Sequence, residues 1–191
     1  MEHAVASQLV NNFQETTVAE ADFDTTVQLY RPKIFRFLLA SLRDRDVAEC
    51  LTQDCFLKAF HALRSFRNEC SMNTWLMQIA VNLLRDHLRN RRLQFWKRAR
   101  RNRPPGSELN NWIADQRQSP EKEVLLKERV QAVWAATELL PEKQRSVFLL
   151  RFVEEMELLE IATVMGMKEG TVKTHLFRAL QSVRGRMEGP R

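Results

Sequence analysis

The sequence has few of the residues that interrupt helices or favour strands. Its 191 residues include only 5 Gly, 6 Pro and a single Tyr, and β-branched residues rarely occur in runs. Sheets depend on β-branched and aromatic residues and on frequent tight turns, so this composition disfavours them. Hydrophobic residues nevertheless make up 44% of the chain, which is enough for folded cores. We therefore expect an all-α protein.

The marks of an exported or membrane-spanning protein are also missing. No apolar run approaches the roughly 18 residues that a bilayer crossing needs, and no basic start is followed by an apolar stretch. Cys50, Cys55 and Cys70 are odd in number and form no CxxC pair, which is typical of reduced thiols. We expect a cytoplasmic location and no membrane insertion.

Catalytic and metal-binding motifs are lacking too. There is no HExxH motif, Walker loop or nucleophile elbow, and the glutamates at 154–157 are explained more simply as solvated charge at a helix end. The cysteines indicate no metal site, because Cys55 falls on an apolar helix face whereas Cys50 and His61 lie outside it. The histidines are scattered: His3, His61, His87 and His175. We expect no catalytic residue, metal, cofactor or small-molecule substrate.

Charge is distributed unevenly along the chain. Residues 1–30 contain five acidic residues and no Lys or Arg, so they carry a net charge of −5. Because the whole chain carries +6, the other 161 residues carry +11. Nine basic residues lie between Arg85 and Arg103, where Asp86 is the only acidic one. This excess favours a polyanionic partner such as nucleic acid, although such runs are more commonly just solvated.

The chain divides into two helical blocks. Residues 101–123 contain three prolines and a glycine and show little hydrophobic periodicity. A connection of this length is unusual within one compact domain. We therefore predict two small helical domains joined by a flexible linker. The expected limits are an acidic tail at 1–19, a first domain at 20–100, a linker at 101–120, a second domain at 121–187 and a tail at 188–191.

The first block contains a helix expected from Asp46 to about Arg64, with Asp46 and Glu49 as a capping-box-like start. At about 100° per residue one face is apolar: Val47, Ala48, Leu51, Cys55, Phe56, Ala59, Ala62 and Leu63. Leu57 and Phe60 lie on the opposite, polar face. They are either contacts to a neighbouring helix or the anchors of a protein-docking patch rimmed by polar groups.

A second helix, over 74–92, combines a core face with a basic face. The broad apolar side holds Leu76, Met77, Ile79, Ala80, Val81, Leu83, Leu84 and Leu88. The other side holds Gln78, Asn82, Arg85, Arg89 and Arg92, with Trp75 at its edge. Arginine binds phosphates bidentately, amide side chains bind base edges, and an aromatic ring stacks on an unpaired base. We favour nucleic-acid binding over a merely solvated basic face.

The polar loop at 65–73 precedes this helix. Small and polar side chains beside Trp75 are suited to a pocket for an extruded base. An ordinary interhelical loop has a similar composition, so this signal is weak by itself.

The second block contains helix-turn-helix spacing at 158–183. Ala162 is small where two helices would cross, Gly166 falls in the turn, and Val172 follows at a buried position. The predicted inner face of the second helix is Val172, Leu176, Ala179, Leu180 and Val183. Its predicted outer face is Lys173, Thr174, Phe177, Arg178, Gln181 and Arg184. Phe177 among hydrogen-bond donors suits the major groove of DNA, which favours DNA binding over a generic helical hairpin.

The residues before this motif complete a four-helix domain. Pro141 is expected near the first turn of a helix, where its missing N–H costs little. The predicted core residues are Val147, Phe148, Leu150 and Phe152, with Val130, Val133 and Trp134 from the preceding helix.

Together the two blocks resemble the sigma factors of bacterial RNA polymerase. "DVAECLTQDCFLKAF" followed by "FRNECSMNTWLMQIAVNLLRDHLRNRR" resembles their second conserved region. "LPEKQRSVFLLRFVEEMELLEIATVMGMKEGTVKTHLFRAL" resembles their fourth. With only these two regions and a linker between them, the chain resembles an extracytoplasmic-function sigma factor over about residues 22–187.

This resemblance implies a subunit that brings core RNA polymerase to promoter DNA and melts it to start transcription. The implied polymerase-docking residues are Asp46, Glu49, Gln53, Leu57 and Phe60. The residues implied to bind and melt the −10 element are Phe66, Arg67, Asn68, Ser71, Thr74, Trp75, Gln78, Asn82, Arg85 and Arg89. Those implied to bind the −35 element are Thr171, Lys173, Thr174, Phe177 and Arg178. The linker would follow the RNA exit path, and an anti-sigma factor, often membrane-anchored in the family, would hold the protein inactive.

The chain departs from the family pattern at three positions. Cys50 replaces a usually acidic residue, Cys55 a commonly aliphatic one, and His175 an outward position that often carries Arg or Ser. The segment "GTVKTHL" is also similar to the helix-turn-helix of quorum-type response regulators, which bind duplex DNA without polymerase. Those proteins carry an α/β domain upstream, whereas the upstream block here is helical and basic.

Overall fold

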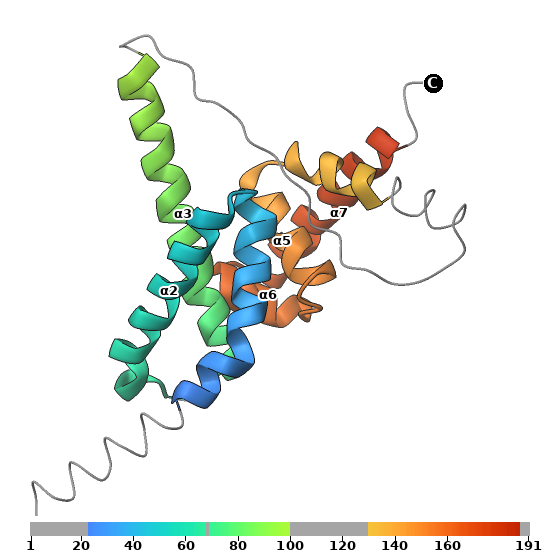
Figure 1. The fold of residues 1–191 in the computed structure, drawn as a ribbon. Helices are drawn as coiled ribbons and strands as arrows, with labels where there is room; N and C mark the ends of the chain where they lie inside the picture. Colours follow the sequence, from blue (N-terminus) through green and yellow to red (C-terminus); the bar gives the residue numbers. More distant parts are fainter. Residues whose placement is uncertain (1–22, 68, 100–129, 188–191) are drawn as a thin grey trace, which may run out of the picture.

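The computed structural model describes residues 23–67, 69–99 and 130–187, and every regular element within these ranges is helical. The first block comprises a helix over residues 23–42, α2 (Arg45–Ala62), a short 3-10 helix (Leu63–Ser65) and α3 (Met72–Ala99). The second comprises a helix over residues 130–138, α5 (Glu142–Phe152), α6 (Leu158–Met165) and α7 (Glu169–Met187) (Figure 1). The predicted all-α fold is confirmed.

Several sequence predictions concern parts of the chain outside the described residues: the tails at 1–19 and 188–191, the linker at 101–120, Asn68 and the side chain of Arg92. The proposed domain limits at 20–100 and 121–187 also extend beyond the described ranges and stay predictions.

A cap that the sequence analysis did not identify starts α2. Asp44 has an extended backbone (φ −130°, ψ 112°), and its carboxylate accepts a 3.0 Å hydrogen bond from the backbone N–H of Val47. This bond satisfies one of the unpaired N–H groups of the first helical turn. The predicted capping box of Asp46 and Glu49 is therefore wrong. Asp46 lies in the first turn, where its negative charge complements the helix dipole.

Apolar faces of three helices hold the first block together. The predicted inner faces are confirmed by the buried residues Ala48, Leu51, Cys55, Phe56 and Ala59 of α2 and Leu76, Met77, Ala80, Val81, Leu83 and Leu84 of α3. The helix over residues 23–42 adds Ile34, Phe37 and Leu38. Because α2 ends at Ala62, Arg64 lies in the 3-10 helix and not in α2 as predicted.

Cys55 is a packing residue of this core. Its Sγ atom lies 3.5 Å from the carbonyl oxygen of Leu76, and burial raises the pKa of the thiol to about 12. Since the thiolate is the reactive form, this cysteine is chemically inert at neutral pH. Cys50, in contrast, is exposed, so the two cysteines face different surroundings as predicted.

The helix-turn-helix spacing of the second block is confirmed. Ala162 is 7% exposed and Val172 is fully buried, as the crossing of α6 and α7 requires. Gly166 ends α6 with a left-handed backbone (φ 64°, ψ 41°), and the following N–H of Met167 donates to the carbonyl of Ala162 at 3.0 Å. Glycine adopts this conformation without steric cost, which is why it serves as a helix C-cap.

Two residues predicted to lie in the core of the second block are at its surface. Leu180 is 41% exposed, because α7 turns its inner face toward Val172, Ala179 and Val183 and leaves Leu180 at the edge. Phe152 is 51% exposed because it is the last residue of α5, where the chain leaves the helix.

The two blocks pack directly against each other, which the sequence analysis left open. Figure 1 shows the helix over residues 23–42 (blue) between α2 and the helices of the second block, while α3 lies beside α6. Arg36 of this helix is hydrogen-bonded to Glu154, and Arg145 of α5 donates to the carbonyl of Ser41. Buried residues of both blocks form one continuous hydrophobic cluster.

The C-cap of α6 gives a first prediction. We expect Gly166→Ala to lower the free energy of unfolding by about 1 kcal/mol, because alanine is strained at positive φ. Nothing lies within 4 Å of a Cβ at this position, so the effect comes from backbone strain and not from a clash. Chemical denaturation monitored by circular dichroism measures it.

Gly185→Ala is the matched control, since Gly185 lies inside α7 with open space around it and an ordinary helical backbone. Alanine is the better helix former there, so this variant should be slightly more stable than the wild type. Equal effects of the two substitutions would contradict the strain argument.

Candidate nucleic-acid and protein interfaces

Five predicted protein-docking residues lie on α2, and we refer to them as the docking face: Asp46, Glu49, Gln53, Leu57 and Phe60. Leu57 is 57% exposed and Phe60 42% exposed. The ring of Phe60 meets that of Phe23 edge-on with 5.3 Å between centroids, so Phe60 does contact a neighbouring helix. Leu57 projects into solvent. Its exposure favours the second predicted role of this face, a protein-docking patch, over contact with a neighbouring helix.

The polar part of the docking face is partly engaged within the first block. The half-buried carboxylate of Glu49 pairs with the guanidinium of Arg31 on the helix over residues 23–42. Asp46 and Gln53 are exposed. The face therefore combines accessible apolar anchors with polar groups at its rim, which is the usual composition of a protein interface.

The polar side of α3 forms a row that we call the α3 stripe: Gln78, Asn82, Arg85 and Arg89. Gln78 is half-buried and the other three residues are exposed. Arg85 donates to the Oδ1 atom of Asn82 at 3.3 Å, and Arg89 pairs with Asp86 at 3.2 Å. Exposed pairs of this kind contribute little stability, so both guanidinium groups are available to an anionic ligand.

An aromatic pair stands at the start of this helix. The rings of Phe66 and Trp75 are stacked, with 4.7 Å between their centroids and 29° between their planes. Phe66 thus covers one face of the indole and fastens the loop to the first turn of α3. Arg67 on the same loop is exposed. The structure brings these predicted residues together beside the α3 stripe.

Ser71 and Thr74 form a local cap at the beginning of α3. The Oγ atom of Ser71 accepts from the backbone N–H of Thr74 at 3.1 Å and lies 2.8 Å from the hydroxyl of Thr74. Thr74 is only 2% exposed, and its hydroxyl also donates to the carboxylate of Glu160 in the second block at 3.3 Å. Thr74, predicted to contact nucleic acid, is therefore covered in this structure.

Sequence reasoning gave no role to Glu160. Its second carboxylate oxygen accepts from the backbone N–H of Glu157 at 3.0 Å and so caps the start of α6. The spacing of three residues between Glu157 and Glu160 is the signal that could have revealed the cap. Nothing local could have revealed the contact with Thr74.

The outer face of α7 lies open to solvent as predicted. Thr171, Lys173, Thr174, Phe177 and Arg178 are all exposed, Phe177 by 61%. Lys173 pairs with Glu169 at 2.7 Å, and the hydroxyl of Thr174 donates to the carbonyl of Gly170 at 2.9 Å. An exposed phenylalanine between cationic side chains is suited to a polyanion that also offers apolar groups, as thymine methyls do in the major groove.

His175 differs from its predicted outward position, because it is half-buried. Burial is the main cause that lowers the pKa of its imidazole below the usual 6.5, and the positive charges of Lys143 and Arg178 lower it further. The ring is therefore neutral at physiological pH and offers one donor and one acceptor.

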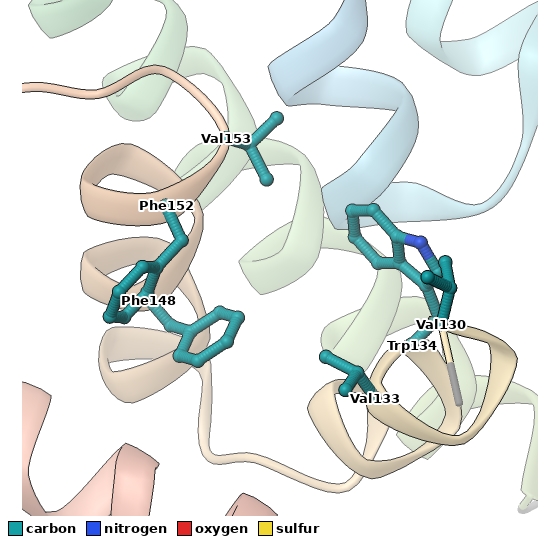
Figure 2. Close-up of a pocket in the computed structure, with 6 residues that line it drawn as sticks. All are labelled: Val130, Val133, Trp134, Phe148, Phe152 and Val153. Atoms are coloured by element: carbon teal, nitrogen blue, oxygen red, sulfur yellow. The ribbon is translucent and has the colours of Figure 1, made fainter. Parts of the chain in front are cut away.

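An apolar pocket of about 400 Å³ opens in the second block, lined by Val130, Val133, Trp134, Phe148, Phe152 and Val153. Figure 2 shows the first three on the helix over residues 130–138 and the two phenylalanines facing them from α5. Sequence analysis assigned most of these residues to the core. It missed the pocket because hydrophobic periodicity does not distinguish a filled interior from a groove.

Comparison with protein-family models gives two matches. Residues 26–94 match Sigma-70 region 2, and residues 130–183 match Sigma-70, region 4. The first range contains the docking face and the α3 stripe, and the second contains α5, α6 and most of α7.

Curated proteins similar to this chain carry corresponding names. The chain is 32% identical to RNA polymerase sigma-H factor of Pseudomonas aeruginosa over 84% of its own length and 83% of the relative. It is 28% identical to ECF RNA polymerase sigma factor SigW of Bacillus subtilis over 85% of its length and 87% of that protein. It is 29% identical to ECF RNA polymerase sigma-E factor of Escherichia coli K12 over 96% of its length and 97% of that protein.

Two solved structures share the fold. The sigma factor RpoE from Bartonella quintana, in complex with the anti-sigma factor NepR, matches with a TM-score of 0.71 and 22% identity over 89% of this chain and 99% of that one. CnrH, in complex with the cytosolic domain of CnrY, matches with a TM-score of 0.62 and 19% identity over 90% of this chain and 91% of that one.

The environment of His175 predicts a pH dependence of stability. Its folded pKa lies below the value of 6.5 that it has in an unfolded chain, so the unfolded state binds more protons as the pH falls. Neutral His175 makes its full contribution to the free energy of unfolding above about pH 6.5. This contribution decreases as the pH falls toward the folded pKa. We expect His175→Gln to flatten the stability profile between about pH 7 and 5.

Urea denaturation at several pH values measures this slope, and an NMR titration of the histidine ring signals reports the pKa directly. His61→Gln, at an exposed position on α2, controls for the loss of any one histidine. If His175→Gln shows the same dependence of stability on pH as the wild type, His175 does not cause that dependence.

Proposed function

The chain belongs to the extracytoplasmic-function class of the sigma-70 family of bacterial RNA polymerase sigma factors, and we propose that it directs core polymerase to promoters by binding their −35 and −10 elements and opening the DNA. The supporting observation is the pair of exposed polar surfaces, one on α3 and one on α7, that the two matched regions present. We expect no catalytic group, cofactor or small-molecule substrate in the chain, because sigma factors are initiation factors and the polymerase core performs the synthesis.

We assign the −35 element to the outer face of α7. A recognition helix enters the major groove with its N-terminal half, and this half carries Thr171, Lys173, Thr174, Phe177 and Arg178. The exposed guanidinium of Arg178 can bind guanine bidentately, as arginine commonly does, and Phe177 can contact a thymine methyl. Lys173, paired with Glu169 on the helix itself, is better suited to a phosphate contact.

We assign the −10 element to the start of α3, the preceding loop and the α3 stripe. Arg85 and Arg89 would hold the phosphate backbone, while Gln78 and Asn82 would contact bases. A base that leaves the duplex needs an aromatic platform to offset the loss of stacking. The Phe66–Trp75 pair supplies that platform next to the stripe, which supports a role in melting and not only in binding.

We assign core polymerase to the docking face. An interface needs apolar anchors that become fully desolvated, surrounded by polar groups that exclude water. Leu57 and Phe60 are such anchors. The polar residues Asp46, Glu49 and Gln53 precede them along the same helix.

We further propose that an anti-sigma factor controls this protein. A similar sigma factor forms such a complex: RpoE from Bartonella quintana binds the anti-sigma factor NepR. A membrane-anchored anti-sigma factor and a cytoplasmic location for the chain are part of the same proposal. None of the helices in the described ranges has the length and apolar character needed to cross a bilayer.

The docking face gives a direct test of polymerase binding. We expect Leu57→Glu/Phe60→Glu to abolish capture of core RNA polymerase in a pull-down, because charge would then replace both apolar anchors. Leu159→Glu is the matched control, since Leu159 is 69% exposed on α6, away from the docking face. Circular dichroism confirms that the variants are folded.

The outcomes distinguish the alternatives. Loss of capture only in the double variant supports a sigma factor that docks through α2. If the double variant still captures the polymerase as the control does, the protein remains a sigma factor, but its docking surface lies elsewhere. No capture by the wild type, with tight binding to duplex DNA alone, would favour an ordinary helix-turn-helix regulator.

The recognition helix gives a second test. In holoenzyme binding to a −35 sequence selected from random DNA, Arg178→Ala should cost about 1–3 kcal/mol, the usual value of one bidentate base contact. Arg186→Ala is the control, because Arg186 lies in the last turn of α7 and is bonded to Ser182. If Arg178→Ala loses as much affinity on a scrambled −35 sequence, the residue contacts only phosphate.

A further inference from the structure

The two rings of the Phe66–Trp75 stack are attached to the protein with unequal firmness, and Trp75 is the firmly held one. It lies in the first turn of α3, where its backbone N–H donates to the carbonyl of Ser71 at 3.0 Å. The hydroxyl of Ser71 accepts from the backbone N–H of Thr74 and caps the same turn. The indole also packs against the hydrophobic core. Both its helix and the core therefore fix the position of Trp75.

Phe66 is held less firmly. It follows the short 3-10 helix with an extended backbone (φ −70°, ψ 113°), and its N–H donates to the carbonyl of Leu63 at 3.1 Å. The next helix begins at Met72. Within the described residues, the ring of Phe66 lies outside the hydrophobic cluster against which Trp75 packs. The stack on Trp75 is therefore the contact that keeps this ring in place.

The stack covers a surface that the proposed function needs. The ring centroids are 4.7 Å apart and the planes differ by 29°, which is the offset arrangement that aromatic pairs prefer. Trp75 is half-buried and already uses part of its indole for the core. Two rings cannot occupy one face of an indole. A base that leaves the duplex must therefore either stack on the outer side of Phe66 or take its place.

The polar groups of α3 favour replacement. Residues three and four apart on a helix are neighbours, so Gln78 lies one turn beyond Trp75, and Asn82 lies one turn beyond Gln78. Amide side chains of this kind bind the edges of bases. A base on Trp75 itself would have its edge beside these amides. A base beyond Phe66 would be farther from α3 by the thickness of one ring.

The exchange is also favourable in chemical terms. A nucleobase has a flat π-surface, and its stacking on an aromatic side chain is at least as strong as the stacking between two side-chain rings. The indole therefore loses one stacked partner and gains another. In the absence of DNA, the ring of Phe66 keeps this apolar face covered from water.

We propose that Phe66 is a displaceable place-holder, whose ring fills the stacking face of Trp75 until an extruded base of the −10 element replaces it. This inference rests on the proposed sigma factor function and describes how its melting site is regulated. A base enters only when its own contacts offset the loss of the Phe66–Trp75 stack. Phe66 would thus make the site selective for bases that stack on Trp75 and also bind α3.

The first experiment removes the ring and measures the sign of the effect. Holoenzyme binds a fluorescent single-stranded oligonucleotide that carries a −10 sequence selected from random DNA with the wild type. If Phe66 covers the indole in nine chains of ten, Phe66→Ala should bind this oligonucleotide about tenfold more tightly. Phe152→Ala, which removes a half-exposed ring at the end of α5, should bind like the wild type. Unchanged or weaker binding by Phe66→Ala would overturn the place-holder, and weaker binding would show that bases stack on Phe66 itself.

An abasic oligonucleotide separates competition from a general loosening of the loop. Single bases are removed one at a time, and the position whose removal weakens wild-type binding most identifies the inserted base. Without that base nothing competes for the indole, so Phe66→Ala should gain no affinity for this oligonucleotide. An equal gain with and without the base would show that the substitution only loosens the loop, and it would overturn the proposal.

The indole itself provides a second control. The tightening requires a free face of Trp75, so Phe66→Ala/Trp75→Ala should bind the selected oligonucleotide no more tightly than Trp75→Ala alone. A tenfold gain that persists without the indole would also overturn the place-holder.

A spectroscopic measurement decides the question if Phe66→Ala does not fold. The wild-type chain is prepared with 4-fluorophenylalanine at position 66, and its fluorine NMR signal is recorded in the holoenzyme. Binding of the selected oligonucleotide should move the signal toward that of the free amino acid in water, because the ring leaves the indole. The abasic oligonucleotide should leave the signal in place. A signal that does not move with either oligonucleotide would overturn the proposal.

Failure of the proposed function has a different signature. If the wild-type chain forms no holoenzyme, or if its holoenzyme selects no sequence from random single-stranded DNA, the chain does not melt promoters as proposed. A wild type that forms holoenzyme and binds its selected oligonucleotide, with no tightening in Phe66→Ala, overturns the place-holder alone.

Discussion

Each helix of this protein is stable only because one of its faces is buried, and this requirement determines where binding surfaces can lie. An isolated helix as short as α6 does not persist in water, so packing must hold it. Burial of one face then fixes the position of the opposite face, and the side chains of that opposite face take no part in the packing. On α3 this leaves Asn82 and Arg85 in a defined row, and on α7 it leaves Phe177 and Arg178 exposed on a rigid support. The cores thus provide preorganisation for surfaces that contribute little to stability themselves.

Burial also decides what each charged group does. Arg85 and Arg89 are exposed and only weakly paired, so their charge remains available to phosphate. Arg36 has the same side chain, but it faces the almost completely buried carboxylate of Glu154 and is used internally. The hydrogen bonds that Arg36 donates to Glu154 hold the pKa of the guanidinium above its ordinary value. Arginine can therefore bind an external polyanion or join the two blocks, and the surroundings of each arginine determine which of these it does.

The amino-acid sequence was sufficient where the determining residues are close together along the chain. Helical periodicity identified the inner faces of α2 and α3, and the spacing of Ala162, Gly166 and Val172 identified the helix-turn-helix. It failed at helix edges and ends, where Leu180 and Phe152 have periodic spacing but no second element to cover them. Contacts between blocks could not be predicted at all. Thr74 and Glu160 lie 86 residues apart, and nothing in the sequence around either one indicates the other. The residues assigned to polymerase and promoter contacts come from the family resemblance, and their exposure is compatible with those roles.

The two oxygens of the Glu160 carboxylate have separate tasks: one caps α6, and the other accepts the hydroxyl of Thr74. When Thr74 leaves, a water molecule can take its place, and the bond to the backbone N–H of Glu157 is unaffected. The cap of α6 therefore does not depend on the first block. The start of the helix-turn-helix motif is set by residues of the second block alone, even though the same carboxylate also contacts α3.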